Sequence, residues 1–154
     1  DYYQESFQKV RAGVEDINRA MRQKFGDDRT YVSIVAEPDA GFHVALDFSG
    51  LKGFSLKDGK DTVTLDTSAH VSSALMHKQK VVMYPGEMFY LDGEDMVLRG
   101  SLNLNRGMEA GKRTEDEHTL AMQRIKDFCL SLEPPMKWQG LAAATPPGVG
   151  GRAT

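Results

Sequence analysis

Seven apolar residues recur at intervals of three and four along the first 25 positions of the chain. They are Tyr3, Phe7, Val10, Val14, Ile17, Met21 and Phe25. This spacing places all seven on one stripe of an α-helix, and Gly26 supplies a C-terminal stop. A helix over residues 2–25 would be about 35 Å long at about 1.5 Å per residue. Such a helix is long for a domain of this size, and its stripe needs another surface to cover it.

A different period begins after this helix. Residues 31–36 are rich in β-branched and aromatic side chains and predict a strand, which a turn containing proline and glycine ends at residues 37–41. Residues 42–48 predict the next strand. Two short alternating pieces, residues 54–56 and 63–65, flank an Asp-Gly pair that is typical of a hairpin turn.

Asp66 or Thr67 can cap a helix that runs to about residue 78. A strand over residues 81–84 and a loop over residues 85–95 follow. The clearest alternation in the chain then spans residues 96–104. On one side lie Met96, Leu98, Gly100, Leu102 and Leu104; on the other lie Val97, Arg99, Ser101 and Asn103. This pattern predicts a two-faced strand whose polar face carries a single guanidinium.

A last helix is predicted after a loop at residues 105–113. Thr114 and Glu117 form a capping box at its start, and Pro134 stops it. Residues 142–154 are small, proline-containing and glycine-rich, and residues 134–154 are therefore predicted to form an extended or disordered tail. The order of elements favours an α/β fold in which helices pack on one face of a small sheet, preceded by the long helix.

Composition limits the number of domains and the classes of binding partner that we expect. A chain of 154 residues with 40% hydrophobic residues, 27% charged residues and a net charge of −3 is expected to be one domain. Neither a basic footprint for nucleic acid nor a membrane anchor is apparent. The lone Cys129 favours an intracellular protein, and we expect a cytoplasmic one. Because the sequence begins at Asp1, we expect a processed protein or a piece of a longer one.

Three segments together resemble a known family. They are PDAGFHVALDFSGL at residues 38–51, VVMYPGEMF at residues 81–89 and LRGSL at residues 98–102. In this order they resemble the C-terminal small domain of fold-type I pyridoxal-phosphate enzymes, the class I and II aminotransferases. The resemblance covers about residues 1–133. It implies that residues 1–25 form the helix that links this domain to a large one.

The resemblance implies a role for Arg99. In the family, the arginine of this strand binds the α-carboxylate of the amino-acid substrate, and Arg99 occupies the matching position. A planar guanidinium offers two parallel donors to a carboxylate, and holding that group orients the substrate's Cα. The alternative is that Arg99 pairs with a carboxylate such as Glu94 on a solvated strand face.

The family's catalytic lysine has no counterpart here. Lys52 lies in a Ser-x-x-Lys sequence, but it follows the small-domain strand and is interpreted as a surface residue. The resemblance therefore implies that pyridoxal 5'-phosphate is held mainly by a large domain or a second subunit outside this chain. We expect no catalytic residue here, an amino-acid or 2-oxo-acid substrate, a role in amino-acid biosynthesis, and a homo-oligomer such as a dimer.

The histidines and the cysteine do not indicate a metal site. His70 and His77 lie seven residues apart, which is not a chelating spacing, so solvated or helix-terminal roles are expected. His43 is expected to pack within the structure rather than face an active site. Cys129 lies on the apolar stripe of the last helix and is expected to act as a small hydrophobic residue.

Two other hypotheses remain open. The chain is a non-catalytic binding module that retains the small-domain fold, or it is an unrelated α/β interaction domain. The first helix discriminates between the aminotransferase hypothesis and these two. A helix that links two domains should leave part of its apolar stripe uncovered when this chain is alone. Neither the substrate nor the reaction type, whether transamination, decarboxylation, racemisation or lyase chemistry, follows from the sequence.

Overall fold

The computed structural model describes residues 2–36, 43–89, 92–101 and 117–136. Within them lie three α-helices: α1 (Tyr2–Phe25), α2 (Ser68–Gln79) and α3 (Glu117–Ser131). The main antiparallel sheet, in the order β1-β2-β6-β5, consists of β1 (Ser33–Ala36), β2 (His43–Asp47), β5 (Tyr84–Pro85) and β6 (Val97–Ser101). A separate hairpin pairs β3 (Ser55–Asp58) with β4 (Asp61–Thr64), as predicted.

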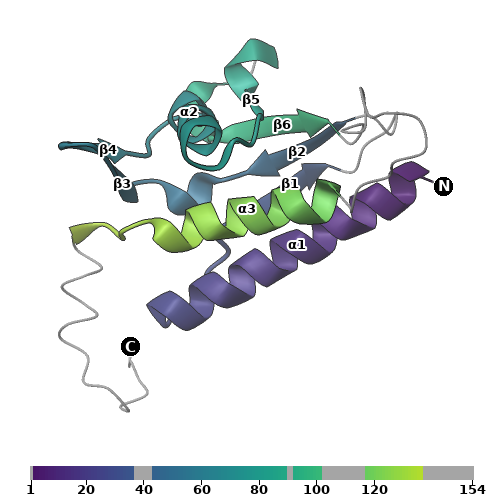
Figure 1. Ribbon diagram of the computed structural model, residues 1–154, viewed down its shortest axis with the longest axis horizontal. Coiled ribbons are helices and arrows are strands. Elements are labelled where there is room, and N and C mark those ends of the chain that lie inside the picture. The colour runs from purple at the N-terminus through teal and green to yellow at the C-terminus, as the bar shows by residue number, and fades with distance from the viewer. Residues whose placement is uncertain (1, 37–42, 90–91, 102–116, 137–154) are drawn as a thin grey trace.

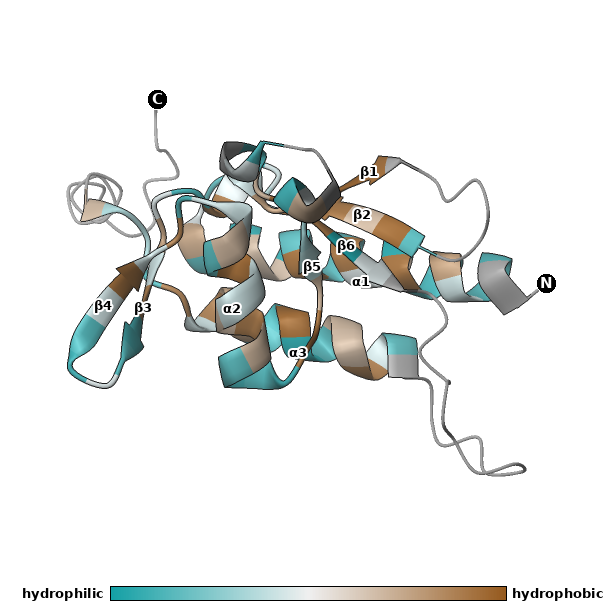
Figure 2. Cartoon of the chain, turned by 90° about the horizontal axis from the view of Figure 1, so that it is seen from above, coloured by the Kyte–Doolittle hydropathy of each residue, from teal (hydrophilic) through white to brown (hydrophobic). Residues whose placement is uncertain are grey.

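The helices and the sheet form two layers. Helices α1 and α3 lie side by side along one face of the sheet, and the β3–β4 hairpin projects at the end away from the N-terminus (Figure 1, Figure 2). Helix α2 packs against α3, β5 and β6. This arrangement confirms the predicted fold class of a small sheet with helices on one face and a long first helix.

Strand register gives the sheet one buried face. On β2, Val44 and Leu46 lie opposite Gly100 and Leu98 of β6, and these three apolar side chains are buried. Residues 45, 47, 97 and 99 alternate to the other face and are only partly buried. The predicted alternation of residues 96–101 is therefore confirmed, while residues 102–104 lie outside the described part of the chain.

The apolar stripe of α1 is covered. Phe7, Val10, Val14, Ile17 and Met21 are all buried, whereas Phe25 is only partly buried. Within residues 7–25, the expected uncovered part of the stripe is therefore confined to its C-terminal end. The cover comes from α3 and the sheet.

Close approach of the two long helices depends on Gly13. A Cβ atom built at this position would lie 2.6 Å from Cβ of Met122, which is too short for any real contact. The absence of a side chain at Gly13 therefore lets α1 and α3 pack nearly backbone to backbone at this point.

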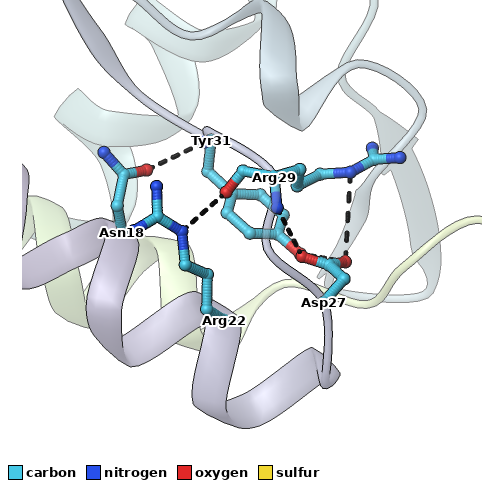
Figure 3. A network of polar contacts seen from close by, with 5 residues as sticks. All are labelled: Asn18, Arg22, Asp27, Arg29 and Tyr31. Carbon is cyan, nitrogen blue, oxygen red and sulfur yellow. Dashed lines mark hydrogen bonds and ion pairs between the residues drawn. The ribbon is translucent and has the colours of Figure 1, made fainter. Parts of the chain in front are cut away.

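The buried side-chain amide of Asn18 on α1 forms hydrogen bonds with the backbone just before β1. Asn18 is 6% exposed, and its Nδ2 donates to the carbonyl oxygen of Val32 at 2.7 Å. Its Oδ1 accepts from the backbone N–H groups of Tyr31 (2.8 Å) and Val32 (3.0 Å). Nearby, Arg22 Nε donates to the carbonyl oxygen of Arg29 at 3.0 Å (Figure 3). The polar groups of this turn are thus satisfied by side chains of α1.

Two predicted strands begin later than expected, for identifiable reasons. β1 begins at Ser33 rather than at residue 31, and the two preceding backbone N–H groups are already bound to Asn18. β5 covers Tyr84–Pro85 rather than residues 81–84. Upstream of it, Val81 N–H donates to the carbonyl oxygen of Leu75, and Ser72 Oγ donates to that of Met83 at 2.6 Å. These backbone groups form hydrogen bonds with residues of α2 and do not pair with a neighbouring strand.

Helix boundaries follow the predicted caps where the structure describes them. Thr67, one of the two candidate caps, accepts from the N–H of His70 at 3.2 Å. α3 is described from Glu117, so the predicted capping box at residues 114–116 lies outside the described residues, as does the tail beyond residue 136. No helix in the described ranges is both long enough and apolar enough to cross a lipid bilayer.

Replacing Asn18 by alanine should destabilise the protein by about 3 kcal/mol, because it leaves two buried N–H groups and one carbonyl without partners. Urea denaturation followed by circular dichroism measures this change. The control is Gln23→Ala, an exposed position on the same helix, which should change the free energy of unfolding by less than about 0.5 kcal/mol. Equal effects of the two substitutions would show that the amide is not the anchor.

Candidate functional site

The candidate site is the face of the main sheet that points away from α1 and α3, which we call the open face. Its described side chains come from three neighbouring strands. They are His43, Ala45 and Asp47 of β2, Val97 and Arg99 of β6, and Tyr84 of β5. His43 and Tyr84 are exposed, Tyr84 by 49%, while the others are partly buried.

Arg99 lies at the centre of this face. Its register partners are Ala45 on one side and Tyr84 on the other. Directly opposite residues in an antiparallel pair have Cβ atoms about 5 Å apart, so Tyr84 and Ala45 flank Arg99, and the small alanine side chain leaves space on its side. Partial burial lowers the local dielectric, which strengthens a charge-assisted hydrogen bond to an anion.

The strand that carries Arg99 is held rigidly from behind. Leu98, its neighbour in sequence, is fully buried, and so is Met96. Met96 has a φ of 53°, a left-handed conformation that is rare for a side chain of this size, and its carbonyl accepts from Phe48 N–H at 3.0 Å. Since a one-residue slip would expose Leu98, packing on the inner face fixes the direction of Arg99.

The prediction that His43 packs inside the structure is wrong. It is exposed and pairs in register with Ser101, so it lies on the open face diagonal to Arg99. Asp47, on the same side of β2, accepts from the backbone N–H of Ser49 at 2.8 Å through Oδ1. A guanidinium, an imidazole and a phenol thus share one surface, which suits the binding of an anionic group.

Other residues singled out by the sequence lie away from this face. Lys52 is exposed, as predicted. His70 accepts from the N–H of Asp66 at the start of α2, and Nδ1 of His77 lies 2.8 Å from the carbonyl oxygen of Ser73. Within the described ranges, no group of three or more histidine, cysteine or acidic residues is placed to hold a metal ion.

Sequence reasoning missed Tyr84 as a neighbour of Arg99. Strand alternation in the sequence puts His43 and Asp47 on one side of β2, so this pair was detectable once the strand was assigned. The pairing of Tyr84 with Arg99 depends on the register between β5 and β6, which joins residues 15 positions apart and has no local sequence signal. Glu94, the alternative partner considered for Arg99, has a side chain outside the described part of the structure.

Comparison with known proteins bears on the fold. No protein-family model matches the chain, and no curated protein matches it. The crystal structure of the aspartate aminotransferase from Rhizobium meliloti is similar, with a TM-score of 0.61 and 20% sequence identity over 85% of this chain. The fold is that of an aminotransferase small domain. The match covers 26% of the Rhizobium enzyme, so this small-domain fold spans about a quarter of that enzyme's length.

Two groups with shifted pKa values lie outside the open face of this small-domain fold. Burial, together with a 2.7 Å hydrogen bond donated to Asp27, raises the pKa of the Tyr31 phenol. Burial raises the pKa of the Cys129 thiol from 9.0 to about 12. Cys129 is fully buried on α3, which confirms that it packs as a small hydrophobic residue. Both shifts are consequences of core packing.

The thiol of Cys129 should be almost inert in the native protein. At pH 8 a pKa of about 12 leaves a thiolate fraction about 1,000-fold smaller than a pKa of 9.0 does, and burial excludes the reagent as well. Labelling with a chromogenic disulfide should therefore be slow in buffer and fast in urea. Rapid labelling of the native protein would contradict the buried position.

The same shift predicts a loss of stability in alkali. Because the folded-state pKa is raised, the folded protein retains a proton that the unfolded chain releases. The contribution of Cys129 is thus present in full below about pH 9 and is lost as the pH rises toward about 12. Cys129→Ala should remove this part of the pH dependence, as measured by urea denaturation at several pH values.

Proposed function

We propose that this chain works as the small domain of a pyridoxal-phosphate-dependent enzyme of the aminotransferase type. In this proposal Arg99 binds the α-carboxylate of an amino-acid or 2-oxo-acid substrate. The observation that carries the proposal is the position of Arg99: one partly buried guanidinium at the centre of the open face, on a fold shared with an aspartate aminotransferase.

Arg99 contributes orientation. Its two parallel N–H donors hold the two carboxylate oxygens, so the substrate cannot rotate about the bond between its carboxylate and Cα. The fully buried Leu98 behind it keeps the strand from shifting. Ala45 leaves room for the substrate beside the guanidinium, and Tyr84 on the other side limits access of water.

The cofactor does not fit this chain alone. Pyridoxal phosphate, when bound to a complete enzyme, supplies a conjugated ring that accepts electron density from the substrate's Cα. It needs a lysine for covalent attachment and a set of donors for its phosphate. The open face has no lysine among its described residues. We therefore assign the cofactor, and the catalytic lysine, to a large domain on the same polypeptide or another chain.

The remaining features of the proposal concern assembly and location. The large domain or second subunit would cover the open face, where Tyr84 is 49% exposed. A cytoplasmic homo-oligomer, such as a dimer, acting in amino-acid biosynthesis completes the proposal. Nucleic acid and membranes are not proposed partners.

The test uses the native protein that contains this chain, purified with its associated domains or subunits. It should absorb in the near ultraviolet and violet, where bound pyridoxal phosphate absorbs, and the spectrum should change when an amino acid is added. Absence of this absorbance would overturn the proposed enzyme. Retention of carboxylate binding without it would instead favour the non-catalytic binding module.

Arg99→Ala should raise the KM for the amino acid by about 10- to 100-fold, because a charge-assisted pair with the carboxylate is lost, and should leave the cofactor absorbance unchanged. Arg99→Lys should retain part of the binding, since it keeps the charge and loses the paired donors. The control is Arg11→Ala, at an exposed position on α1. An unchanged KM in Arg99→Ala would refute the assignment of this residue.

A further inference from the structure

A cavity of about 380 Å³ lies on the other side of the sheet from Arg99. It is partly open to solvent, and it is lined by the inner faces of β2 and β6, residues 80–83, α3, and Val10 of α1. Its size falls within the range of small-molecule sites, roughly 300–1,000 Å³. None of the residues proposed to bind the amino acid faces this cavity.

Small side chains create the space. Gly100, which follows Arg99 in β6, lines the cavity without a side chain, and Met83 packs against it: a Cβ atom at this position would lie 3.1 Å from Cε of Met83. Ala121 on α3 lines the same cavity with a side chain of one carbon. Around them the wall is apolar, with side chains from Val44, Leu46, Met122 and Ile125. Filling such a space restores dispersion contacts that its lining lacks.

Basic residues line part of the cavity. Lys80, His118 and Arg124 line the cavity, and no aspartate or glutamate does so among the described residues. His118, in the first turn of α3, is 5% exposed, whereas Lys80 is exposed and Arg124 partly buried. Lys80 follows α2, whereas His118 and Arg124 both lie on α3, so the packing of these two helices brings the basic residues together.

Lys80 is held at the cavity by the end of α2. It is the C-cap of this helix in a left-handed conformation, with a φ of 57°, and its N–H donates to the carbonyl oxygen of Met76. This cap turns the chain sharply into residues 81–83, which form one wall. Val82 and, across the cavity on α3, Leu120 are each about half exposed, so the apolar lining continues to the surface.

We propose that this cavity binds a small amphiphilic anion, an aliphatic carboxylate whose chain fills the apolar interior and whose head group meets Lys80 and Arg124. A cavity of about 150 Å³ accommodates benzene, so one of 380 Å³ has room for roughly 15 non-hydrogen atoms. A carboxylate of about ten carbons matches that size. The site is independent of the proposed enzyme function, because it lies on the opposite face of the sheet.

The test is a titration of the native protein with decanoate and with 1-decanol, both below their aggregation limits, by isothermal calorimetry. The two probes share an apolar chain and differ in the charge of the head group. Decanoate should bind at least about tenfold more tightly than the alcohol. Equal affinities would overturn the anion preference, and no binding of either probe would overturn the site.

Substitutions test whether decanoate binds in the cavity. Ala121→Phe should fill the cavity and lower decanoate affinity by about tenfold or more, whereas Ala12→Phe, at an exposed position on α1, should not. Replacing Lys80 and Arg124 together by serine should bring the affinity for decanoate down to that for the alcohol and leave the alcohol's affinity unchanged. This second variant decides the matter if Ala121→Phe fails to fold.

The variant Arg99→Ala distinguishes binding in this cavity from binding on the open face. Decanoate affinity should be unchanged in Arg99→Ala, even though the amino acid should bind less tightly. A loss of decanoate binding in this variant would show that the probe occupies the open face instead, which would overturn the assignment to the cavity.

Discussion

A single buried amide determines where the sheet meets the helices. Asn18 uses its donor and its acceptor on the backbone of Tyr31 and Val32, so α1 acts toward these residues much as a neighbouring strand would. Because these groups are buried, no water can replace the side chain. The register of β1 on β2, and through β2 that of β6, follows from where this contact places the chain.

The alternation of β6 then divides the molecule into two chemically different faces. Arg99 points to the open face, and Gly100, the next residue, points to the cavity between the sheet and the helices. The open face collects polar and charged groups around a guanidinium. The inner face is apolar, and Lys80, His118 and Arg124 also line its cavity. Two adjacent residues of one strand therefore serve two separate candidate sites.

Local sequence signals were sufficient for much of the fold. The stripe of α1, the Asp-Gly hairpin, the Thr67 cap and the alternation around Leu98 each depend on residues close together in the chain, and the structure confirms them. The errors arose where distant groups compete for the backbone. Asn18 binds the N–H groups that would have begun β1, and Ser72 binds a carbonyl upstream of β5. The expectation that His43 packs inside was wrong, although the alternation of β2 puts it on the same side as Asp47 and opposite the buried Val44 and Leu46.

The sequence by itself determined the α/β class and the long first helix, because helix and strand periods are properties of neighbouring residues. The choice of Arg99 rests on the family resemblance and stays a prediction. Only the tertiary structure decided that α3 and the sheet cover the stripe of α1, that Tyr84 and His43 join Arg99 on one face, and that three basic residues surround an apolar cavity. These relations depend on strand register and helix packing. Both bring together residues that are far apart in sequence and that carry no local signal of their partners.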